Sequence, residues 1–148
     1  MKEIDSSQTF LPFLCIQLGY HPTVLAQCIV CVENGKPIAG VIYDHYNSVS
    51  VQAHIWVAEG AVPSREWYVA IFDYPFNRLE VRKIVGQVQQ DNELAQKLDE
   101  HFGFVLEARV TDFSAHGDLL MYTMTRDQCL VLNSPLWRKV AEKIKRIA

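Results

Sequence analysis

A change in the period of the apolar side chains, near the middle of the chain, constrains the fold most. Over residues 49–57 apolar and polar residues alternate, which is typical of a strand with one buried face. The apolar members of this run are Val49, Val51, Ala53, Ile55 and Val57. Past Gly60 the apolar residues recur at helical spacing, so we expect a helix over residues 64–77, bent or ended by Pro75. The chain therefore mixes strands and helices.

The rest of the chain continues this mixture. Before residue 49 we expect a short helix over 6–18 and strands over 26–33 and 38–46, with a hairpin turn at Asn34-Gly35. After residue 77 we expect a strand over 83–89, a helix from Asp91-Asn92 to Gly103, strands over 104–110 and 119–125, and a basic helix from Ser134-Pro135. This order predicts an α/β (α+β) fold, with a mixed, mostly antiparallel central sheet of six or seven strands and helices on both faces.

Length and charge exclude several classes of function. The 148 residues fit a single domain spanning 1–148, and no repeat or long linker divides them. The net charge of −3 gives no reason to expect binding to nucleic acid. The longest apolar runs, such as Cys28–Val32, are too short to cross a membrane. The first five residues do not have the profile of a secretory signal, so we expect a cytoplasmic protein.

Two of the four cysteines, Cys28 and Cys31, form a CxxC pair, which in other contexts indicates a zinc or redox site. The surrounding run is β-branched and apolar, and residues three apart on a strand point to opposite faces. No second CxxC or histidine pair completes a tetrahedral site. We therefore interpret the cysteines as small apolar residues and expect no metal.

The segment over residues 74–104 carries a more specific pattern. Arg78-Leu79-Glu80-Val81-Arg82-Lys83-Ile84 leads into a strand, Asn92-Glu93-Leu94-Ala95 opens a helix, and Gly103-Phe104 ends it. Further on, Gly117-Asp118 begins a strand that contains Tyr122, Met124 and Arg126. In this order and at these distances, residues 25–132 resemble the GNAT superfamily of N-acetyltransferases, and the last motif resembles its branch that acetylates ribosomal proteins.

The resemblance implies a GNAT-like fold that uses acetyl-CoA as co-substrate and needs no metal. Two neighbouring strands should part, so that the pantetheine arm inserts between them and pairs with the backbone near Ile55, Trp56 and Val57. The next helix should bind the diphosphate with its free N–H groups and positive end, at Ser64, Arg65 and Glu66. Asn92 should contact the pantetheine.

The loop before that helix departs from the family pattern. The family's glycine-rich diphosphate loop falls in this sequence on residues 59–64, where Ser64 is the one small residue at an expected place and Pro63 lacks an N–H. The guanidinium of Arg65 can compensate by contacting a phosphate, although a solvated charge in the first turn of a helix is the other interpretation.

Three residues are candidates for the chemistry. Tyr122 matches the tyrosine of the late strand motif; a core tyrosine with a satisfied hydroxyl is an equally good interpretation. His54 and Glu59, on and just after the strand that should hold the cofactor, are candidate bases, and both also fit a polar surface. Many family members place a tyrosine near the sulfur on the helix that begins at the asparagine, and in this sequence that position is Asp99.

Two functions remain open at this point. The first is an N-acetyltransferase that moves the acetyl group to a primary amine, by direct attack in a ternary complex. Its acceptor would be a protein N-terminus, a lysine or a small amine; the short segment before the first strand favours a macromolecule. The alternative is a weak or inactive GNAT-like module that binds CoA or a protein partner. We expect a monomer or a homodimer.

Overall fold

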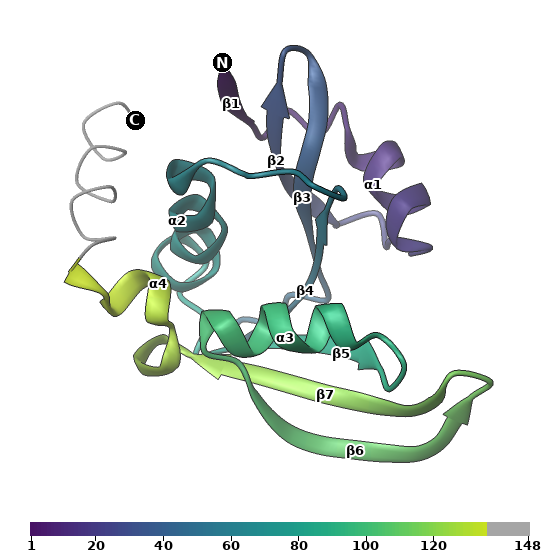
Figure 1. The fold of residues 1–148 in the computed structure, drawn as a ribbon. Coiled ribbons are helices and arrows are strands. Elements are labelled where there is room, and N and C mark those ends of the chain that lie inside the picture. The colour runs from purple at the N-terminus through teal and green to yellow at the C-terminus, as the bar shows by residue number, and fades with distance from the viewer. Residues whose placement is uncertain (136–148) are drawn as a thin grey trace.

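The protein is described by a computed structural model that covers residues 1–135. Seven strands form one sheet in the order β1-β2-β3-β4-β5-β7-β6. The strands are β1 (Lys2–Asp5), β2 (Gln27–Glu33), β3 (Lys36–Asp44), β4 (Ser50–Val57), β5 (Lys83–Gln89), β6 (Val105–Ser114) and β7 (Gly117–Thr125). The helices are α1 (Leu11–Leu18), α2 (Arg65–Asp73), α3 (Glu93–Phe102) and the short α4 (Leu130–Asn133) (Figure 1).

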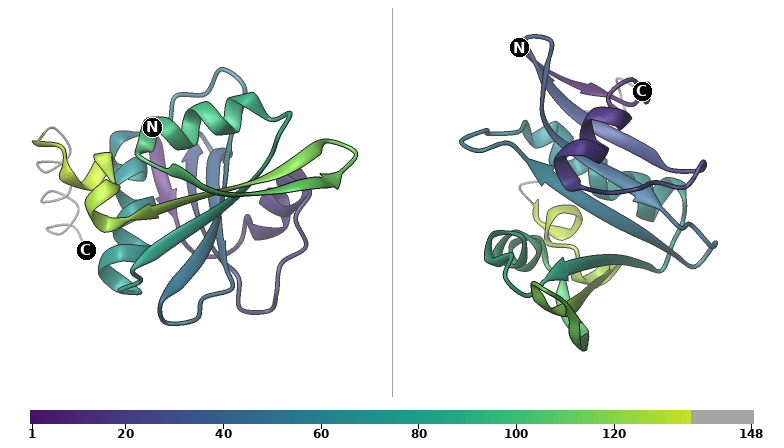
Figure 2. Two further views of the ribbon diagram at one scale, coloured as in Figure 1. Left: turned by 90° about the horizontal axis from the view of Figure 1, so that it is seen from below. Right: turned by 90° about the vertical axis from the view of Figure 1, so that its right-hand side faces the viewer.

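The sheet is mixed and mostly antiparallel, as predicted. Every neighbouring pair of strands is antiparallel except β4 and β5, which run parallel. In the right-hand view of Figure 2, the sheet extends from β1 at the top to the β6–β7 hairpin at the bottom. The parallel pair therefore joins an antiparallel N-terminal half to an antiparallel C-terminal half.

The β2–β3 hairpin shows how local sequence determines this arrangement. Asn34 and Gly35 both have positive φ, of 51° and 81°, which a two-residue turn of this handedness requires. Glu33 and Lys36 are paired across it. The hairpin predicted from Asn34-Gly35 is confirmed.

Helices cover both faces, and each face has its own core. α2 and α3 lie on one face, over a large cluster that includes Trp67 and Phe72. α1 lies on the other face, where Leu14 packs in a smaller cluster (Figure 1). Cys28 belongs to the smaller core and Cys31 to the larger one, and both are reduced. The prediction that these two thiols diverge is confirmed.

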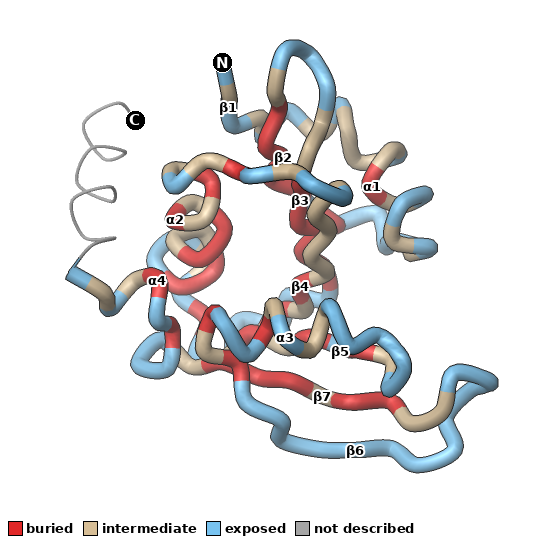
Figure 3. The backbone as a smooth tube through the Cα atoms, in the orientation of Figure 1, coloured by how far each residue is buried: buried red, intermediate tan, exposed pale blue. Residues whose placement is uncertain are grey.

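The structure differs from the predicted elements in three places. Residues 2–5 form an edge strand that was not predicted, and α1 begins only at Leu11, so that Pro12 lies in its first turn, where it breaks no helical hydrogen bond. As predicted for Pro75, the α-helix ends there: α2 stops at Asp73, and the chain continues as a π-helical turn, Tyr74–Arg78. β6 extends to Ser114 and is exposed along its length (Figure 3). The predicted basic helix from Ser134 onward lies almost wholly outside the described residues.

None of the helices within residues 1–135 is long and apolar enough to cross a membrane.

Helix α1 approaches the sheet closely at Gly40 of β3. A Cβ atom added there would lie 2.5 Å from Cδ2 of Leu14, a side chain that is fully buried. We expect Gly40→Ala to lower the free energy of unfolding by about 1–3 kcal/mol, because the added methyl overpacks this contact. Urea denaturation measures the effect. In a Leu14→Ala background the same change should cost clearly less, and an equal cost in both backgrounds would contradict the contact.

Candidate active site

Strands β4 and β5 pair over only three residues and then part. The last aligned pair is Gln52 with Val85, so Ala53 and Gly86 are the first residues beyond it. A cleft of about 230 Å³ opens there. It is lined by Leu18, Tyr20, Ala53, His54, Ile55, Gly86, Gln87, Val88, Gln89, Asn92, Ala95, Leu98, Asp99 and Phe104. The parting of these strands, which the resemblance implied, is present in the structure.

The three β4 residues expected at the cofactor lie beyond the paired stretch. Ile55 lines the cleft. The ring of Trp56 instead packs edge-on against Phe13 of α1, with the ring centroids 5.4 Å apart, and Val57 packs against the larger core. Along this stretch β4 pairs with β3 on one side only. Its outer backbone edge is therefore available for hydrogen bonds to an extended ligand.

Helix α2 begins at Ser64, which caps it. The Ser64 hydroxyl accepts a hydrogen bond from the Trp67 N–H at 3.2 Å, and the backbone of Ser64 is extended. The N–H groups of Arg65 and Glu66, in the first turn, have no acceptor within the helix. These donors and the positive end of the helix form a site suited to an anion, with the exposed Arg65 side chain beside it.

Helix α3 forms one wall of the cleft, and its start is fixed by its cap. The side chain of Asn92 accepts from the Ala95 N–H at 3.2 Å. Asn92 itself lines the cleft. Its predicted contact with pantetheine is untested, but its position beside the cleft agrees with that prediction.

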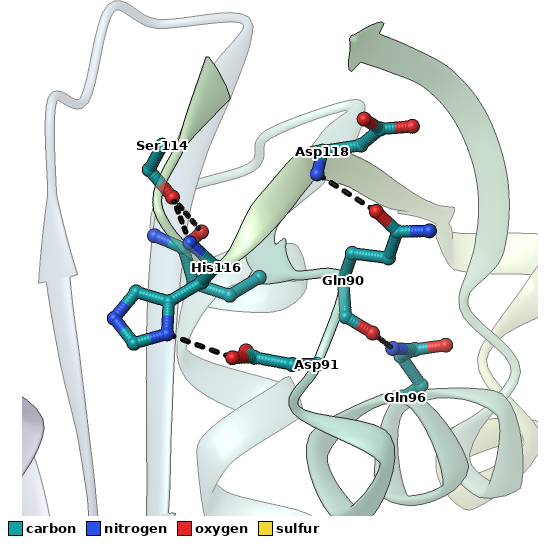
Figure 4. Close-up of polar contacts among 7 residues, drawn as sticks. Gln90, Asp91, Gln96, Ser114, His116 and Asp118 are labelled. Carbon is teal, nitrogen blue, oxygen red and sulfur yellow. Dashed lines mark hydrogen bonds and ion pairs between the residues drawn. The ribbon is translucent and has the colours of Figure 1, made fainter. Parts of the chain in front are cut away.

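A polar network ties the start of α3 to the β6–β7 turn (Figure 4). The side-chain oxygen of Gln90 accepts a hydrogen bond from the backbone N–H of Asp118 at 2.9 Å. The backbone carbonyl of Gln90 accepts one from the side-chain amide of Gln96 at 2.8 Å. A ring nitrogen of His116 lies 2.7 Å from Asp91. These contacts hold the wall of the cleft against the sheet.

His54 lines the cleft from β4. Its ring stacks on Tyr20, with centroids 4.1 Å apart, and the Tyr20 hydroxyl donates to Asp44 at 2.7 Å. His54 Nε2 is buried and has no hydrogen-bond partner among residues 1–135. Burial lowers the pKa of His54 to about 4, so the ring is neutral at pH 7. A neutral imidazole with an unsatisfied nitrogen is the form that can exchange a proton with a ligand.

The other two catalytic candidates do not line this cleft. Tyr122 is buried in the larger core, and its hydroxyl donates to Glu100 at 3.2 Å. Glu59 is exposed in the loop after β4. Of the three candidates, the structure brings only His54 to the cleft, and the roles of Tyr122 and Glu59 remain predictions.

Asp99 lines the cleft and was not among the predicted catalytic residues. It is only 7% exposed, and burial, followed by the nearby charge of Glu100, raises its pKa to about 7. A signal was present in the sequence: Asp99 lies on the same helical face as Ala95 and Phe102, where apolar residues are expected. A carboxyl group on the buried face of a helix needs an explanation.

The last residues of β3 and the two that follow it line a separate hollow of about 440 Å³, together with residues 23–25. Tyr43, Asp44, His45 and Tyr46 all contribute to it. The Tyr43 hydroxyl donates to the Ile71 carbonyl, and Asp44 accepts from Tyr20 and Thr23. The Tyr46 hydroxyl donates to the Leu79 carbonyl at 3.4 Å, so three of the four side chains already hold structural hydrogen bonds. Within residues 1–135 no three side chains of the metal-binding types gather as a metal site.

Comparison with known proteins agrees with this geometry. No family model and no curated protein sequence matches the chain. Among solved structures, a mutant of the spermidine/spermine N-acetyltransferase SpeG from Vibrio cholerae matches with a TM-score of 0.69 and 19% identity, over 90% of this chain and 100% of that one. The ribosomal-protein-S5-alanine acetyltransferase from Vibrio fischeri matches with 0.63 and 14%, over 86% and 94%.

A third match was solved with the cofactor that the sequence implied. The N-acetyltransferase PseH from Campylobacter jejuni, in complex with acetyl coenzyme A, matches with a TM-score of 0.57 and 14% identity, over 85% of this chain and 99% of that one. The chain therefore has the GNAT fold, in which these three acetyltransferases are built.

The raised pKa of Asp99 predicts how stability depends on pH. In the unfolded chain an aspartate loses its proton near pH 4, whereas folded Asp99 keeps it up to about pH 7. The unfolded state thus binds fewer protons in this window, so the contribution of Asp99 to the free energy of unfolding falls as pH rises, by up to about 1.4 kcal/mol per pH unit. Because asparagine does not titrate, Asp99→Asn should gain stability relative to the wild type from pH 4 to 7 and hold that gain above.

Urea denaturation at pH 4.5, 5.5, 6.5 and 8 checks this prediction. His54 has the opposite slope, because its lowered pKa makes stability rise with pH below its ordinary value, but it is common to both proteins and cancels in the difference. Glu93→Gln removes an exposed carboxylate from the same helix and is the matched control for the loss of one carboxyl group. A pH-independent difference for Asp99→Asn would contradict the raised pKa.

Proposed function

We propose that the protein is an acetyl-CoA-dependent N-acetyltransferase that acetylates a primary amine. One observation carries this proposal: the sheet parts between β4 and β5 into a lined cleft, and a free helix start, that of α2, follows β4 directly in the chain. An open strand edge suits the amides of a pantetheine arm, and a helix start suits a diphosphate. Acetyl-CoA contains both groups.

The proposed binding mode assigns a part to the predicted cofactor residues other than Ser64, whose hydroxyl caps α2. The arm lies along the backbone of β4 at Ile55, Trp56 and Val57, with Asn92 on the opposite wall. The phosphates lie at the first turn of α2, against the N–H groups of Arg65 and Glu66 and the guanidinium of Arg65.

The reaction joins the two substrates in one complex. The amine nitrogen attacks the carbonyl carbon of the thioester, a C–N bond forms, and the C–S bond breaks. The nitrogen becomes acidic once it has attacked, and the neutral ring of His54 on the cleft wall can then accept its proton. This chemistry draws on alignment and proton transfer alone.

The acceptor class is inferred from the chemistry and from the neighbours. The names of the matched proteins give spermidine or spermine as acceptor in one case and a ribosomal protein in another. We infer a primary amine for this chain as well, on a protein N-terminus, a lysine or a small molecule. α1 is the one helix between β1 and β2, and it covers one face of the sheet. In the segment between α1 and β2, Val24 and Leu25 are exposed. This open edge favours a macromolecular acceptor.

One feature favours a second candidate, a CoA-binding or protein-interaction module with little activity. Pro63 provides no N–H before α2, and the Ser64 hydroxyl is occupied by Trp67. The helix start therefore offers fewer donors to a diphosphate than a glycine-rich loop would. Binding and turnover experiments separate the two candidates.

Arg65 provides the binding test. We expect Arg65→Gln to raise the Kd for CoA by roughly tenfold, because a hydrogen bond to a charged group contributes about 1.5 kcal/mol or more. Isothermal titration calorimetry measures this. Arg82→Gln removes the same charge next to the paired end of β4 and β5 and should leave the Kd within twofold. Equal losses in the two variants would mean that only the overall charge matters, and the α2 site would be wrong.

Turnover is measured as the release of CoA thiol from acetyl-CoA, with peptides bearing free N-termini, lysine peptides and polyamines as acceptors. We expect acceptor-dependent release for at least one of these amines, well above the rate of hydrolysis without an amine. Tight CoA binding with no amine acetylated would favour the CoA-binding module. An absence of CoA binding would overturn the acetyltransferase and leave the protein-interaction module.

A further inference from the structure

Asp99 occupies a particular place in the cleft, the point where the two strands begin to part. Gly86 is the first β5 residue past the last aligned pair. A Cβ atom on Gly86 would lie 3.5 Å from the Asp99 carboxylate and 3.9 Å from the Ala53 carbonyl oxygen. The carboxyl group of Asp99, which projects from α3, therefore lies against the apex of the cleft. A ligand arm that enters from the open end has its tip nearest to this group.

The surroundings leave the carboxyl group unengaged. No hydrogen bond from another residue in the described part of the chain reaches its oxygens, although the side chain is almost fully buried. The titratable groups nearby are Glu100 on its own helix, Tyr122 on the packed strand β7, and His54 and Tyr20 on the facing wall of the cleft. None of them is a cation at pH 7 that would hold Asp99 ionised.

An unpaired carboxyl group at this depth weakens the fold when it is ionised, and an apolar residue would fill the position on the buried face of α3 without that cost. It is also the only carboxyl group among the residues that line the cleft. Both points favour a role for Asp99 in the chemistry of the cleft over a role in packing.

We propose that Asp99 is the group that gives a proton to the sulfur of CoA as the thioester breaks. This inference rests on the proposed function. As the C–S bond breaks, the electron pair goes to sulfur, and the protonated carboxyl group of Asp99 donates its proton to it, so that CoA leaves as the neutral thiol. The attacking nitrogen loses one proton to His54 or water, and the Asp99 carboxylate regains a proton from solvent. One proton is released and one taken up, so the step balances.

The position of this group makes the step sensitive to pH. The pKa of Asp99 is raised to about 7, chiefly by burial, so a substantial fraction of the molecules carries the proton at neutral pH. Tyr122 is the rival donor, but its hydroxyl is directed to Glu100 and it does not line the cleft. The two residues are therefore distinguished by substitution.

The test compares Asp99→Asn, Asp99→Glu and Tyr122→Phe with the wild type, using acetyl-CoA and whichever amine is acetylated best. We expect Asp99→Asn to lower kcat by about 100-fold while the Kd for CoA stays within threefold, as is typical for the loss of a general acid. Asp99→Glu, which keeps an acid, should recover part of that loss. The kcat of the wild type should fall above about pH 7, and the Asp99→Asn variant should lack this alkaline limb.

The control variant carries its substitution on the same helix as Asp99. Glu93→Gln should change neither kcat nor the pH profile, because that exposed carboxylate lies outside the cleft lining. If Asp99→Asn keeps the rate and the alkaline limb while it binds CoA, or if only Tyr122→Phe loses them, Asp99 is not the donor and the proposed function is unaffected. If the wild type does not bind CoA, the proposed function fails, and this proposal with it.

A second measurement does not depend on turnover. Covering a half-protonated carboxyl group with the end of the cofactor should raise its pKa further, so CoA binding at pH 7 should take up a fraction of a proton. Titration calorimetry in two buffers of different ionisation enthalpy measures this uptake. It should vanish in Asp99→Asn and persist in Glu93→Gln; uptake unchanged in Asp99→Asn would place the cofactor end away from Asp99.

Discussion

The arrangement of the site depends on one feature of the sheet: β4 and β5 pair over only a short stretch. Neighbouring parallel strands usually satisfy each other's backbone hydrogen-bonding groups along their whole length. β4 and β5 do so over three residues only. Beyond that point the sheet stays together through its flanking antiparallel pairs, β3 with β4 and β5 with β7. The unpaired backbone edge of β4 and the cleft follow from this early separation, and the buried carboxyl group of Asp99 lies at the apex of the cleft.

The two faces of the sheet contribute different elements to the surroundings of that cleft. On one face α2 and α3 bury a large aromatic core, including Trp67 and Phe72, which fixes the helix start where phosphates are proposed to bind. On the other face α1 and a small core carry Leu18 and Tyr20 to the rim of the cleft. The proposed cofactor side is thus built on the larger of the two cores, and the proposed acceptor side on the smaller one.

Much of the fold could be predicted from local signals. The Asn34-Gly35 turn, the Asn92 cap and the alternation over residues 49–57 each depend on a few neighbouring residues, and the structure has the corresponding elements. β1 could not be predicted in this way, because residues 2–5 form a short segment in which three of the four residues are charged, and it becomes a strand only by pairing with β2. The π-helical turn at Pro75 depends similarly on what surrounds it.

The site was harder to predict than the fold. His54 could be placed because the family resemblance implied a cleft beside the strand that carries it. Asp99 was first noted as the place where a tyrosine was absent, since its burial and its distance from Gly86 depend on how α3 packs on the sheet. The raised pKa of Asp99 depends on packing and cannot be predicted from the sequence. The presence of a carboxyl group on an apolar helical face can be predicted from it.

The close contact between Gly40 and Leu14 limits how this protein can diversify. With no room between helix and strand, α1 has little freedom to shift or rotate without disturbing the smaller core. In the chain between α1 and β2, Tyr20 and Thr23 are held by hydrogen bonds to Asp44, whereas Val24 and Leu25 are exposed and carry no such restriction. Changes of acceptor preference among descendants or engineered forms should therefore accumulate in that connecting segment, while the helix before it stays in place.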